Sequence, residues 1–273
     1  MERIALVTGA GSGFGLATAT ELASLGFTTV GLVPDGREAD ALTRAAADRG
    51  VAVEVVEADL ADPAERQAAL ADRHLYALVN NAGYLNAGLL RDVGIDEARR
   101  QLEVMVLAPL DLAQRALPHM LRRGEGRIVN VTSAAVHTST AVSGWYQASK
   151  AALRELTDAL RLELASTGID VIDVEPGGFK TGIWGRGQAE LAERRRHSAD
   201  PDAYRQAARA IDRAEPKMGQ PEEVATTIGQ ALTTAHPKVH YRVGRDAGPL
   251  RVVAELVPDR WWDRVSARAS GVA

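Results

Sequence analysis

The sequence predicts one α/β domain built on a doubly wound parallel sheet of about seven strands, with helices on both faces. Two patterns predict this fold. Short apolar runs alternate with longer segments of helical spacing, and the connections between them are short. The apolar runs are continuous rather than alternating, which is typical of strands that helices cover on both sides.

The expected elements alternate between strand and helix through most of the chain. Strands are expected at residues 4–7, 28–33, 51–56, 77–80, 127–131 and 170–174, with a last edge strand at 241–244. Helices are expected at residues 16–25, 38–49, 63–71, 95–121, 145–166 and 222–233. Residues 177–217 are only weakly periodic, and residues 249–268 form an amphipathic tail. No linker or internal repeat divides the chain, so residues 1–273 are assigned to a single domain.

The composition is that of an ordinary globular protein and excludes several kinds of function. Of the 273 residues, 46% are hydrophobic, and the formal net charge of −4 gives no basic excess that would point to nucleic acid. The absence of cysteine excludes disulfides and cysteine-ligated metals, and we expect no metal site. No stretch approaches the roughly 18 apolar residues of a spanning helix. We therefore expect a cytoplasmic protein without stable membrane insertion.

A glycine-rich turn lies between the first expected strand and the first expected helix. Without a Cβ, glycine lets backbone N–H groups approach a pyrophosphate closely, and the following helix N-terminus adds a favourable dipole. No Gly-Lys-Ser/Thr is present, so the turn is not an ATP-type P-loop. The residues predicted to bind a dinucleotide here are Thr8, Gly9, Ser12, Gly13, Phe14 and Gly15. The alternative is an ordinary glycine-rich turn without a ligand.

Tyr146 and Lys150 are the candidate proton-transfer pair, because they lie four residues apart on an expected helix and so share a face. An ammonium near a phenol favours the phenolate. We therefore expect the pKa of Tyr146 to fall, which suits proton exchange with a carbonyl or alcohol oxygen. Ser133 follows the fifth strand, at the sheet edge where ligands bind in this architecture, and can orient the same oxygen. The alternative is a solvent-exposed Tyr and Lys beside a polar loop.

Together these motifs resemble the classical short-chain dehydrogenases/reductases, over roughly residues 1–185. Further matching positions are Asp59, Leu60, Asn80, Asn81, Ala82, Gly83, Pro176, Gly177 and Thr181. The resemblance implies a Rossmann fold, and it implies that these residues bind the cofactor together with the glycine turn, Tyr146 and Lys150. The implied activity is that of an NAD(P)-dependent oxidoreductase, such as a carbonyl reductase or an alcohol dehydrogenase.

The resemblance also implies a role for each catalytic residue. Tyr146 exchanges a proton with the reacting oxygen, and Ser133 holds that oxygen. Lys150 binds the nicotinamide ribose and lowers the pKa of Tyr146. Hydride passes between the nicotinamide and the substrate carbon, so the protein supplies orientation and electrostatics.

One position departs from the family pattern. The family carries an Asn in the helix before the fifth strand, where it helps to hold a water that extends a proton relay from the lysine. Met105 occupies that position here, and a thioether cannot make those hydrogen bonds. Either another water or a backbone carbonyl completes the relay, or turnover is slow or lost.

The choice of cofactor depends on the end of the second strand. NAD-preferring members usually end this strand with an Asp, where the present chain has Val33 followed by Pro34. NADP-preferring members often carry a basic residue where Ser12 or Pro34 stands, and neither is basic. Arg37 is the nearest candidate for a 2′-phosphate, with a solvated turn residue as the alternative. The missing Asp favours NADP(H) over NAD(H).

The C-terminal third is expected to bind the substrate. Residues 181–215 match the family's mobile substrate loop, in which Ile183 and Trp184 offer an apolar wall. Residues 241–247 and 257–260, together with residues 104–110 apart from Met105, resemble the steroid and retinol dehydrogenase-like branch, and residues 245–273 correspond to its C-terminal extension. That likeness implies a bulky, largely apolar alcohol or ketone, such as a steroid-, polyketide- or retinoid-like compound.

The same resemblance bears on assembly. It implies a homodimer or homotetramer that pairs through the helices at 95–121 and 145–166. Trp261 and Trp262, in the C-terminal extension, are expected to pack against the body of the protein or a neighbouring subunit.

Two other functions stay open. One is a cofactor-binding regulatory or scaffold protein that has lost turnover, for which Met105 is the only support. The other is a related reaction that retains the cofactor, such as epimerisation or dehydration.

Overall fold

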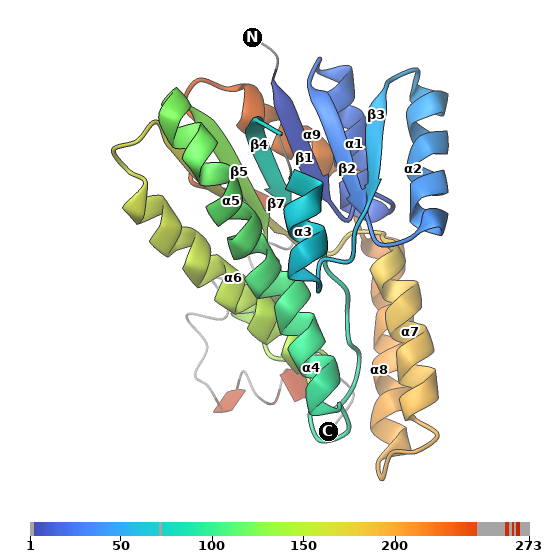
Figure 1. The fold of residues 1–273 in the computed structure, drawn as a ribbon. Coiled ribbons are helices and arrows are strands. Elements are labelled where there is room, and N and C mark those ends of the chain that lie inside the picture. Colours follow the sequence, from blue (N-terminus) through green and yellow to red (C-terminus); the bar gives the residue numbers. More distant parts are fainter. Residues whose placement is uncertain (1–2, 71–72, 245–259, 262–263, 265, 268–273) are drawn as a thin grey trace.

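The computed structural model describes residues 3–70, 73–244, 260–261, 264 and 266–267, and its centre is a single parallel sheet (Figure 1). Seven strands lie in the order β3-β2-β1-β4-β5-β6-β7. They are β1 Ile4–Thr8, β2 Thr28–Val33, β3 Val53–Glu57, β4 Leu75–Asn80, β5 Gly126–Val131, β6 Ile169–Pro176 and β7 His240–Val243. The order reverses between β1 and β4, which is the switch point where ligands bind in open α/β sheets. The predicted doubly wound fold is confirmed.

Helices cover both faces of the sheet (Figure 1). One face carries α1 Gly13–Ser24, α2 Gly36–Arg49 and α9 Pro221–Thr233, and the other carries α3 Pro63–Leu70, α5 Ala108–Arg123 and α6 Gly144–Glu163. Alternate side chains of each strand reach the two apolar cores that result. Ala5 and Val7 of β1 face the first set of helices and Leu6 faces the second, each without solvent exposure. The continuous apolar runs of the sequence follow from this double coverage.

The helix expected at residues 95–121 is interrupted. The structure has α4 Ile95–Leu102, a π-helical turn η1 Glu103–Leu107, and then α5. Pro109 has no N–H to donate back to the carbonyl of Met105, so a regular α-helix cannot pass this point without losing a hydrogen bond. The wider π turn takes its place. It packs against α6, which carries the candidate catalytic residues.

Residues 181–215 were expected to be a loop, but they form two helices, α7 Gly182–Arg194 and α8 Pro201–Ala214. The two lie side by side and extend beyond the C-terminal edge of the sheet (Figure 1). Asp200 caps α8 by accepting a hydrogen bond from the N–H of Ala203 at 3.2 Å. A separate apolar cluster around Tyr204 and Leu191 holds this pair of helices against the loop that follows β4.

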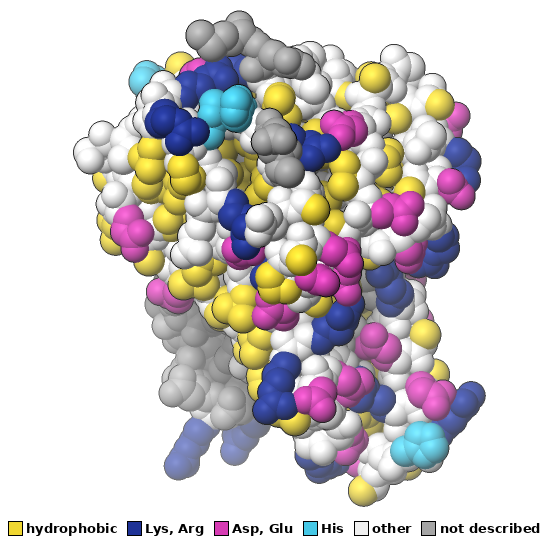
Figure 2. All heavy atoms as spheres, viewed as in Figure 1, with side chains coloured by type: hydrophobic (Ala, Val, Ile, Leu, Met, Phe, Trp, Pro, Cys, Tyr) yellow, Lys and Arg dark blue, Asp and Glu magenta, His cyan; other side chains and the backbone are white. Residues whose placement is uncertain are grey.

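Charged side chains of both signs are interspersed on the face drawn in Figure 2, including the surface of α7 and α8. No described helix is long and apolar enough to cross a bilayer. Most of the predicted tail, including Trp262, lies outside the described residues. Trp261 is 63% exposed, so the expected packing of its side chain against the body of the protein is not seen. The guanidinium of Arg264 lies 5.8 Å from the centre of its ring.

Candidate active site

A cavity of about 690 Å³ opens at the C-terminal edge of the sheet, bounded by the glycine turn, the ends of β4 to β6, and α7 with α8. Most of the predicted site residues line it. They are Gly9, Ser12, Gly13, Phe14, Asp59, Leu60, Asn81, Ala82, Gly83, Ser133, Tyr146, Lys150, Pro176, Gly177 and Thr181. The structure therefore brings together residues that are up to 172 positions apart, from Gly9 to Thr181.

Four other predicted residues do not line the cavity. Thr8, Gly15 and Asn80 are part of the framework behind it. Arg37 is exposed on the first turn of α2, outside the cavity. Arg37, the cation that the sequence suggested for a 2′-phosphate, therefore lies outside the cavity in which the cofactor is expected.

The glycine turn has the shape of a phosphate cradle. Gly9 and Gly13 adopt φ values of +65° and +52°, which L side chains rarely adopt. A Cβ on Gly15 would overlap the carbonyl oxygen of Gly9. The turn is thus held close to the start of α1, with free N–H groups and the helix dipole directed at the cavity.

Thr8 and Asn81 hold this turn against the end of β4. The Thr8 hydroxyl accepts hydrogen bonds from the N–H groups of Asn81 and Ala82, both at 3.0 Å. The Asn81 amide donates to the carbonyl of Thr8 at 2.9 Å. On the far side, Thr181 packs on the turn, since a Cβ on Gly13 would lie 3.2 Å from its side chain.

Asn80 anchors a second part of the framework. Its amide donates to Asn130 of β5 at 2.8 Å, and the amide of Asn130 donates to Thr157 of α6 at the same distance. This buried chain of polar groups ties β4, β5 and α6 together. It thereby fixes the helix that carries Tyr146 and Lys150.

Ser133 and Tyr146 form the centre of the site. Tyr146 comes from the first turn of α6 and Ser133 from the end of β5, and the two side chains are hydrogen-bonded. Ser133 Oγ also accepts from the N–H of Ala135 at 3.1 Å, which fixes its orientation. Burial raises the pKa of Tyr146, and the hydrogen bond from Ser133 lowers it. The expected fall in this pKa is thus not seen, because desolvation of the phenolate outweighs the stabilisation that its neighbours provide.

Lys150 lies one turn further along α6 and is almost fully buried. Its Nζ donates to the carbonyl of Val131 at 2.6 Å and lies 5.9 Å from the centre of the Tyr146 ring. Burial lowers the pKa of Lys150 to about 8, and the charge of Asp173 acts in the opposite direction. The ammonium of Lys150 therefore loses its proton near pH 8, beside the phenol of Tyr146.

Met105 is fully buried in the π turn and lies beside the lysine. A Cβ on Gly83 would lie 3.4 Å from Met105 Cε and 3.6 Å from Lys150 Nζ, so the methyl group and the ammonium lie against the same glycine. One turn earlier, the Gln101 amide donates to the carbonyl of Tyr84 at 2.9 Å and contacts Met105 Sδ at 3.6 Å. An apolar methyl group thus stands where the family has a hydrogen-bonding amide.

Two ion pairs that line the cavity could not be found from the sequence. Arg186 of α7 contacts Glu38 Oε1 at 3.2 Å and Ser12 Oγ at 3.4 Å, and all three residues line the cavity. Asp59 pairs with Arg100 of α4 at 2.9 Å. Burial raises the pKa of Asp59, but the hydrogen bonds from Ala61 and Arg100 outweigh it, and the net pKa is lowered. Sequence spacing gives no signal for contacts between residues so far apart.

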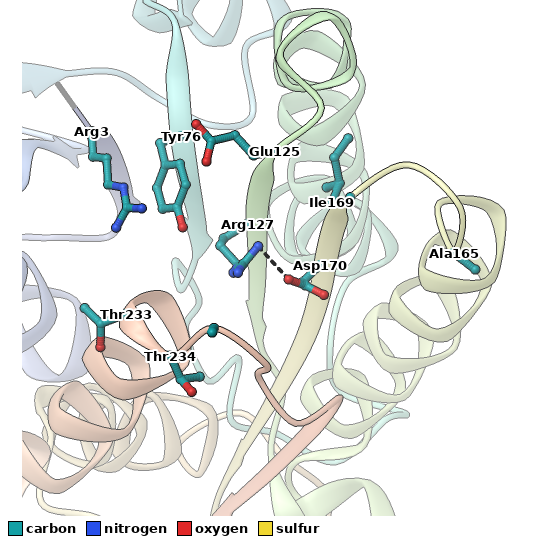
Figure 3. Close-up of a pocket in the computed structure, with 11 residues that line it drawn as sticks. Arg3, Tyr76, Glu125, Arg127, Ala165, Ile169, Asp170, Thr233 and Thr234 are labelled. Carbon is teal, nitrogen blue, oxygen red and sulfur yellow. Dashed lines mark ion pairs between the residues drawn. The ribbon is translucent and has the colours of Figure 1, made fainter. Parts of the chain in front are cut away.

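A second cavity, of about 480 Å³, lies at the opposite edge of the sheet, where β1, β4, β5 and β6 begin (Figure 3). Its charges are paired within the protein. Arg127 contacts Asp170 at 2.5 Å, and the guanidinium of Arg3 lies 4.5 Å from the centre of the Tyr76 ring. The predicted site residues lie at the other edge, so we assign the site to the first cavity.

Comparison with known proteins decides the family. The profile of the family described as short chain dehydrogenase matches residues 3–191. The chain belongs to the short-chain dehydrogenases/reductases. The identification made from the motifs is therefore confirmed, and the chain is an NAD(P)-dependent oxidoreductase.

Two relatives and one solved structure are similar to this chain over two thirds or more of its length. The chain is 29% identical to the NADPH-dependent 3-dehydrocapnine reductase of Ornithobacterium rhinotracheale, over 96% of this chain and 95% of that protein. It is 33% identical to the estradiol 17-beta-dehydrogenase 2 of Mus musculus, over 67% of this chain and 50% of that protein. The latter agrees with the predicted steroid dehydrogenase-like branch. A family member from Burkholderia phymatum, solved in complex with NAD, has a TM-score of 0.78 and 28% identity, over 93% of this chain and 92% of that one.

Proposed function

We propose that the chain interconverts a ketone or aldehyde and an alcohol on a bulky, largely apolar substrate, with Tyr146 as the acid/base. The observation that supports this most is the hydrogen-bonded pair of Ser133 and Tyr146, which faces a cavity of about 690 Å³. The glycine turn lines the same cavity, so the cofactor and the substrate share this volume, and the apolar character of the wall is what supports the substrate class.

The wall that α7 and α8 contribute to the cavity is largely apolar. One face of α8 contributes Ala207, Ala210 and Ile211 to the cavity, and Ile183 and Trp184 of α7 extend it. Small and aliphatic side chains offer few hydrogen bonds, so the substrate is held by burial of its own apolar surface. A steroid-, polyketide- or retinoid-like compound has that character.

The proton step follows from the positions of three side chains. A nicotinamide cofactor, when bound, supplies the hydride chemistry. Ser133 donates a hydrogen bond that orients the reacting oxygen, and Tyr146 gives that oxygen a proton during reduction or takes one during oxidation. Because burial raises the pKa of Tyr146, the phenol stays protonated at neutral pH, which is the form that reduction requires. The Lys150 ammonium is positioned to stabilise the phenolate that reduction leaves.

The residues present fit a dinucleotide. A Cβ on Gly15 would overlap the carbonyl oxygen of Gly9, so the turn presents only backbone atoms to a phosphate at the start of α1. We propose that NADP(H) is preferred over NAD(H). The end of β2 offers Val33 and Pro34 to the cavity rather than a carboxylate for the ribose hydroxyls. A guanidinium, that of Arg186, lies beside Ser12. The relative named as NADPH-dependent is consistent with this preference.

The direct test combines NADPH or NADH with a panel of ketones and aldehydes, ranging from short aliphatic to polycyclic, and follows absorbance at 340 nm. We expect oxidation of the cofactor with bulky apolar ketones and little with short ones. Turnover that is confined to small polar carbonyls would contradict the proposed substrate class. Tight cofactor binding without turnover of any substrate would instead support the second candidate, a cofactor-binding protein that has lost activity.

Met105 is the observation that favours that second candidate, and replacing it gives a prediction. We expect Met105→Asn to change kcat by less than about fivefold, because Ser133, Tyr146 and Lys150 are already in place and an added amide supplies only one hydrogen bond, worth about 1 kcal/mol. Steady-state rates from pH 6 to 9 measure the effect, with Met105→Leu as the matched apolar control. A rise of a hundredfold in the Asn variant alone would show that the natural chain lacks a working relay.

We also propose a homodimer or homotetramer. Leu107 and Leu121 of the α5 region and Leu162 of α6 are each about half or more exposed, on the helices expected to pair. Light scattering coupled to size-exclusion chromatography gives the mass. A monomer at micromolar concentration would contradict the proposal.

A further inference from the structure

Asp173 is a carboxylate buried without any solvent exposure, and the proposed reaction does not use it. It lies in the middle of β6, where Val171, two residues earlier, belongs to the core beneath α6. Alternate residues of a strand share a face, so Asp173 also points toward α6. A buried carboxylate costs several kcal/mol unless it is hydrogen-bonded and balanced by positive charge. Its partners therefore indicate what it does.

Two groups contact the carboxylate directly. The Thr132 hydroxyl donates to Oδ1 at 2.5 Å, and His240 of β7 approaches Oδ2 through Nδ1 at 3.2 Å. The other ring nitrogen of His240 lies 3.5 Å from Asp158, which is partly exposed on α6. The imidazole thus joins the buried carboxylate to one near the surface. These contacts tie Asp173 to the strand end that precedes Ser133.

The catalytic lysine lies in the same part of the interior. Lys150 projects from α6 and donates to the carbonyl of Val131, the residue directly before Thr132. Val131 pairs with Val174 in the sheet, next to Asp173. The charge of Asp173 acts on Lys150 and opposes the effect of burial on the pKa of the ammonium. The lysine and the carboxylate thus share one interior layer between α6 and the sheet.

Other charged groups on this layer are already paired. Glu175, two residues along β6, lies 3.2 Å from His137 and 3.6 Å from Arg242. Asp158 also pairs with Arg161 at 2.9 Å. Burial and the nearby charge of Glu175 raise the pKa of Asp173, the hydrogen bonds from Thr132 and His240 lower it, and the net pKa is raised.

We propose that Asp173, held in place by Thr132 and His240, is the counter-charge that keeps Lys150 protonated, and that it thereby sets the pH range in which the site works. Asp173 is a positioning residue, since it acts through Lys150 and not on the substrate. The catalytic consequence rests on the proposed function, whereas the coupling between the two charges does not. The coupling also gives the buried carboxylate a role. It supplies a charged group near the lysine in a chain that has Met105 where the family has an Asn.

The coupling can be measured without turnover. The chain has four lysines, at positions 150, 180, 217 and 238, so the ¹³Cε resonances of labelled lysine can be followed individually by NMR. The Lys150→Arg variant assigns the buried one. In the full chain we expect Lys150 to titrate near pH 8. In Asp173→Asn, which keeps the shape of the side chain but removes the charge, we expect a midpoint about 1 pH unit lower, because an opposite charge has been lost.

Asp170→Asn is the matched control. It removes a carboxylate from the same strand, but this one pairs with Arg127 beside the second cavity. The Lys150 midpoint is expected to stay unchanged in this variant. If Asp173→Asn does not fold, His240→Leu replaces it. Loss of the imidazole makes Asp173 easier to protonate, so the Lys150 midpoint falls in the same direction but by less.

An unchanged Lys150 midpoint in Asp173→Asn, or in His240→Leu if only that variant folds, overturns the inference whether or not the protein turns over. Where activity is found, the alkaline limb of kcat/KM for ketone reduction is expected to move about 1 pH unit lower in Asp173→Asn, with kcat at pH 6.5 within about threefold of the parent. A uniform loss at every pH would mean that Asp173 is only structural. A shifted Lys150 midpoint with no turnover in any variant would refute the proposed function and leave the inference standing.

Discussion

Replacing Tyr146 by Phe is expected to lower kcat by about 1,000-fold, because no other described side chain offers a proton donor at the same place beside Ser133. Positioned acid/base groups contribute about 10²–10⁴-fold to a rate. The ring and its packing in the apolar cluster with Ile183 and Ile211 are retained. The Kd for NADPH, measured by fluorescence, is therefore expected to stay within about threefold of the parent value.

The matched control is Tyr241→Phe. Tyr241 lies in β7, and its hydroxyl accepts from the N–H of Lys238 at 3.0 Å. Loss of that hydroxyl should leave kcat unchanged. Residual activity of one tenth or more in Tyr146→Phe would refute the acid/base assignment. Equal losses in both variants would indicate general destabilisation rather than chemistry.

The sheet and the clustering of the candidate site residues were predictable because the signals for them are local. The central strands β1, β2 and β4 are nearly continuous apolar runs, and each candidate catalytic residue follows directly from a strand end or lies on one helix face. Ser133 and Tyr146 could be placed together because the carboxyl ends of parallel strands share an edge of the sheet. No long-range contact had to be guessed.

The parts that could not be predicted depend on weak or distant signals. The π turn at Glu103–Leu107 has helical periodicity on both sides, and only Pro109 marks the break. The expectation that residues 177–217 are only weakly periodic was wrong for α8, which buries Ala203, Tyr204 and Ala207 on one face and carries charged residues on the other. Packing against the loop after β4 stabilises α7 and α8, and the sequence does not show that loop as a partner.

The raised pKa of Tyr146 is a third difference between expectation and structure. Sequence spacing placed a cation near the phenol and therefore predicted that its pKa would fall. The structure adds the low-dielectric surroundings of the hydroxyl, and these favour the neutral phenol. Local spacing thus identifies the partners of a titrating group but not its solvation.

Replacing Arg186 by Ala is expected to weaken NADPH binding about 10–100-fold and to leave NADH binding within about threefold. A charge-assisted hydrogen bond to an ionised group contributes about 1.5–3 kcal/mol. Arg186 is the guanidinium beside Ser12 at the glycine turn, where the 2′-phosphate of NADPH, the proposed cofactor, would need a cation. NADH carries no 2′-phosphate and cannot gain from it. Titration of both cofactors at fixed ionic strength gives the two Kd values.

Two further variants separate this role from simple packing. Glu38 pairs with Arg186 and is almost fully buried at the cavity wall. Its carboxylate both neutralises the guanidinium and repels a phosphate, so Glu38→Gln is expected to tighten NADPH binding severalfold and to leave NADH binding nearly unchanged.

Arg37→Ala tests the candidate that the sequence suggested. Because the Arg37 side chain is exposed and lies outside the cavity, we expect no change in the binding of either cofactor. Selective loss of NADPH binding in Arg37→Ala, or equal losses of both cofactors in Arg186→Ala, would contradict the assignment. The sign of the Glu38→Gln effect is the most discriminating of these results, because a carboxylate that instead bound the ribose hydroxyls of NADH would give the opposite change.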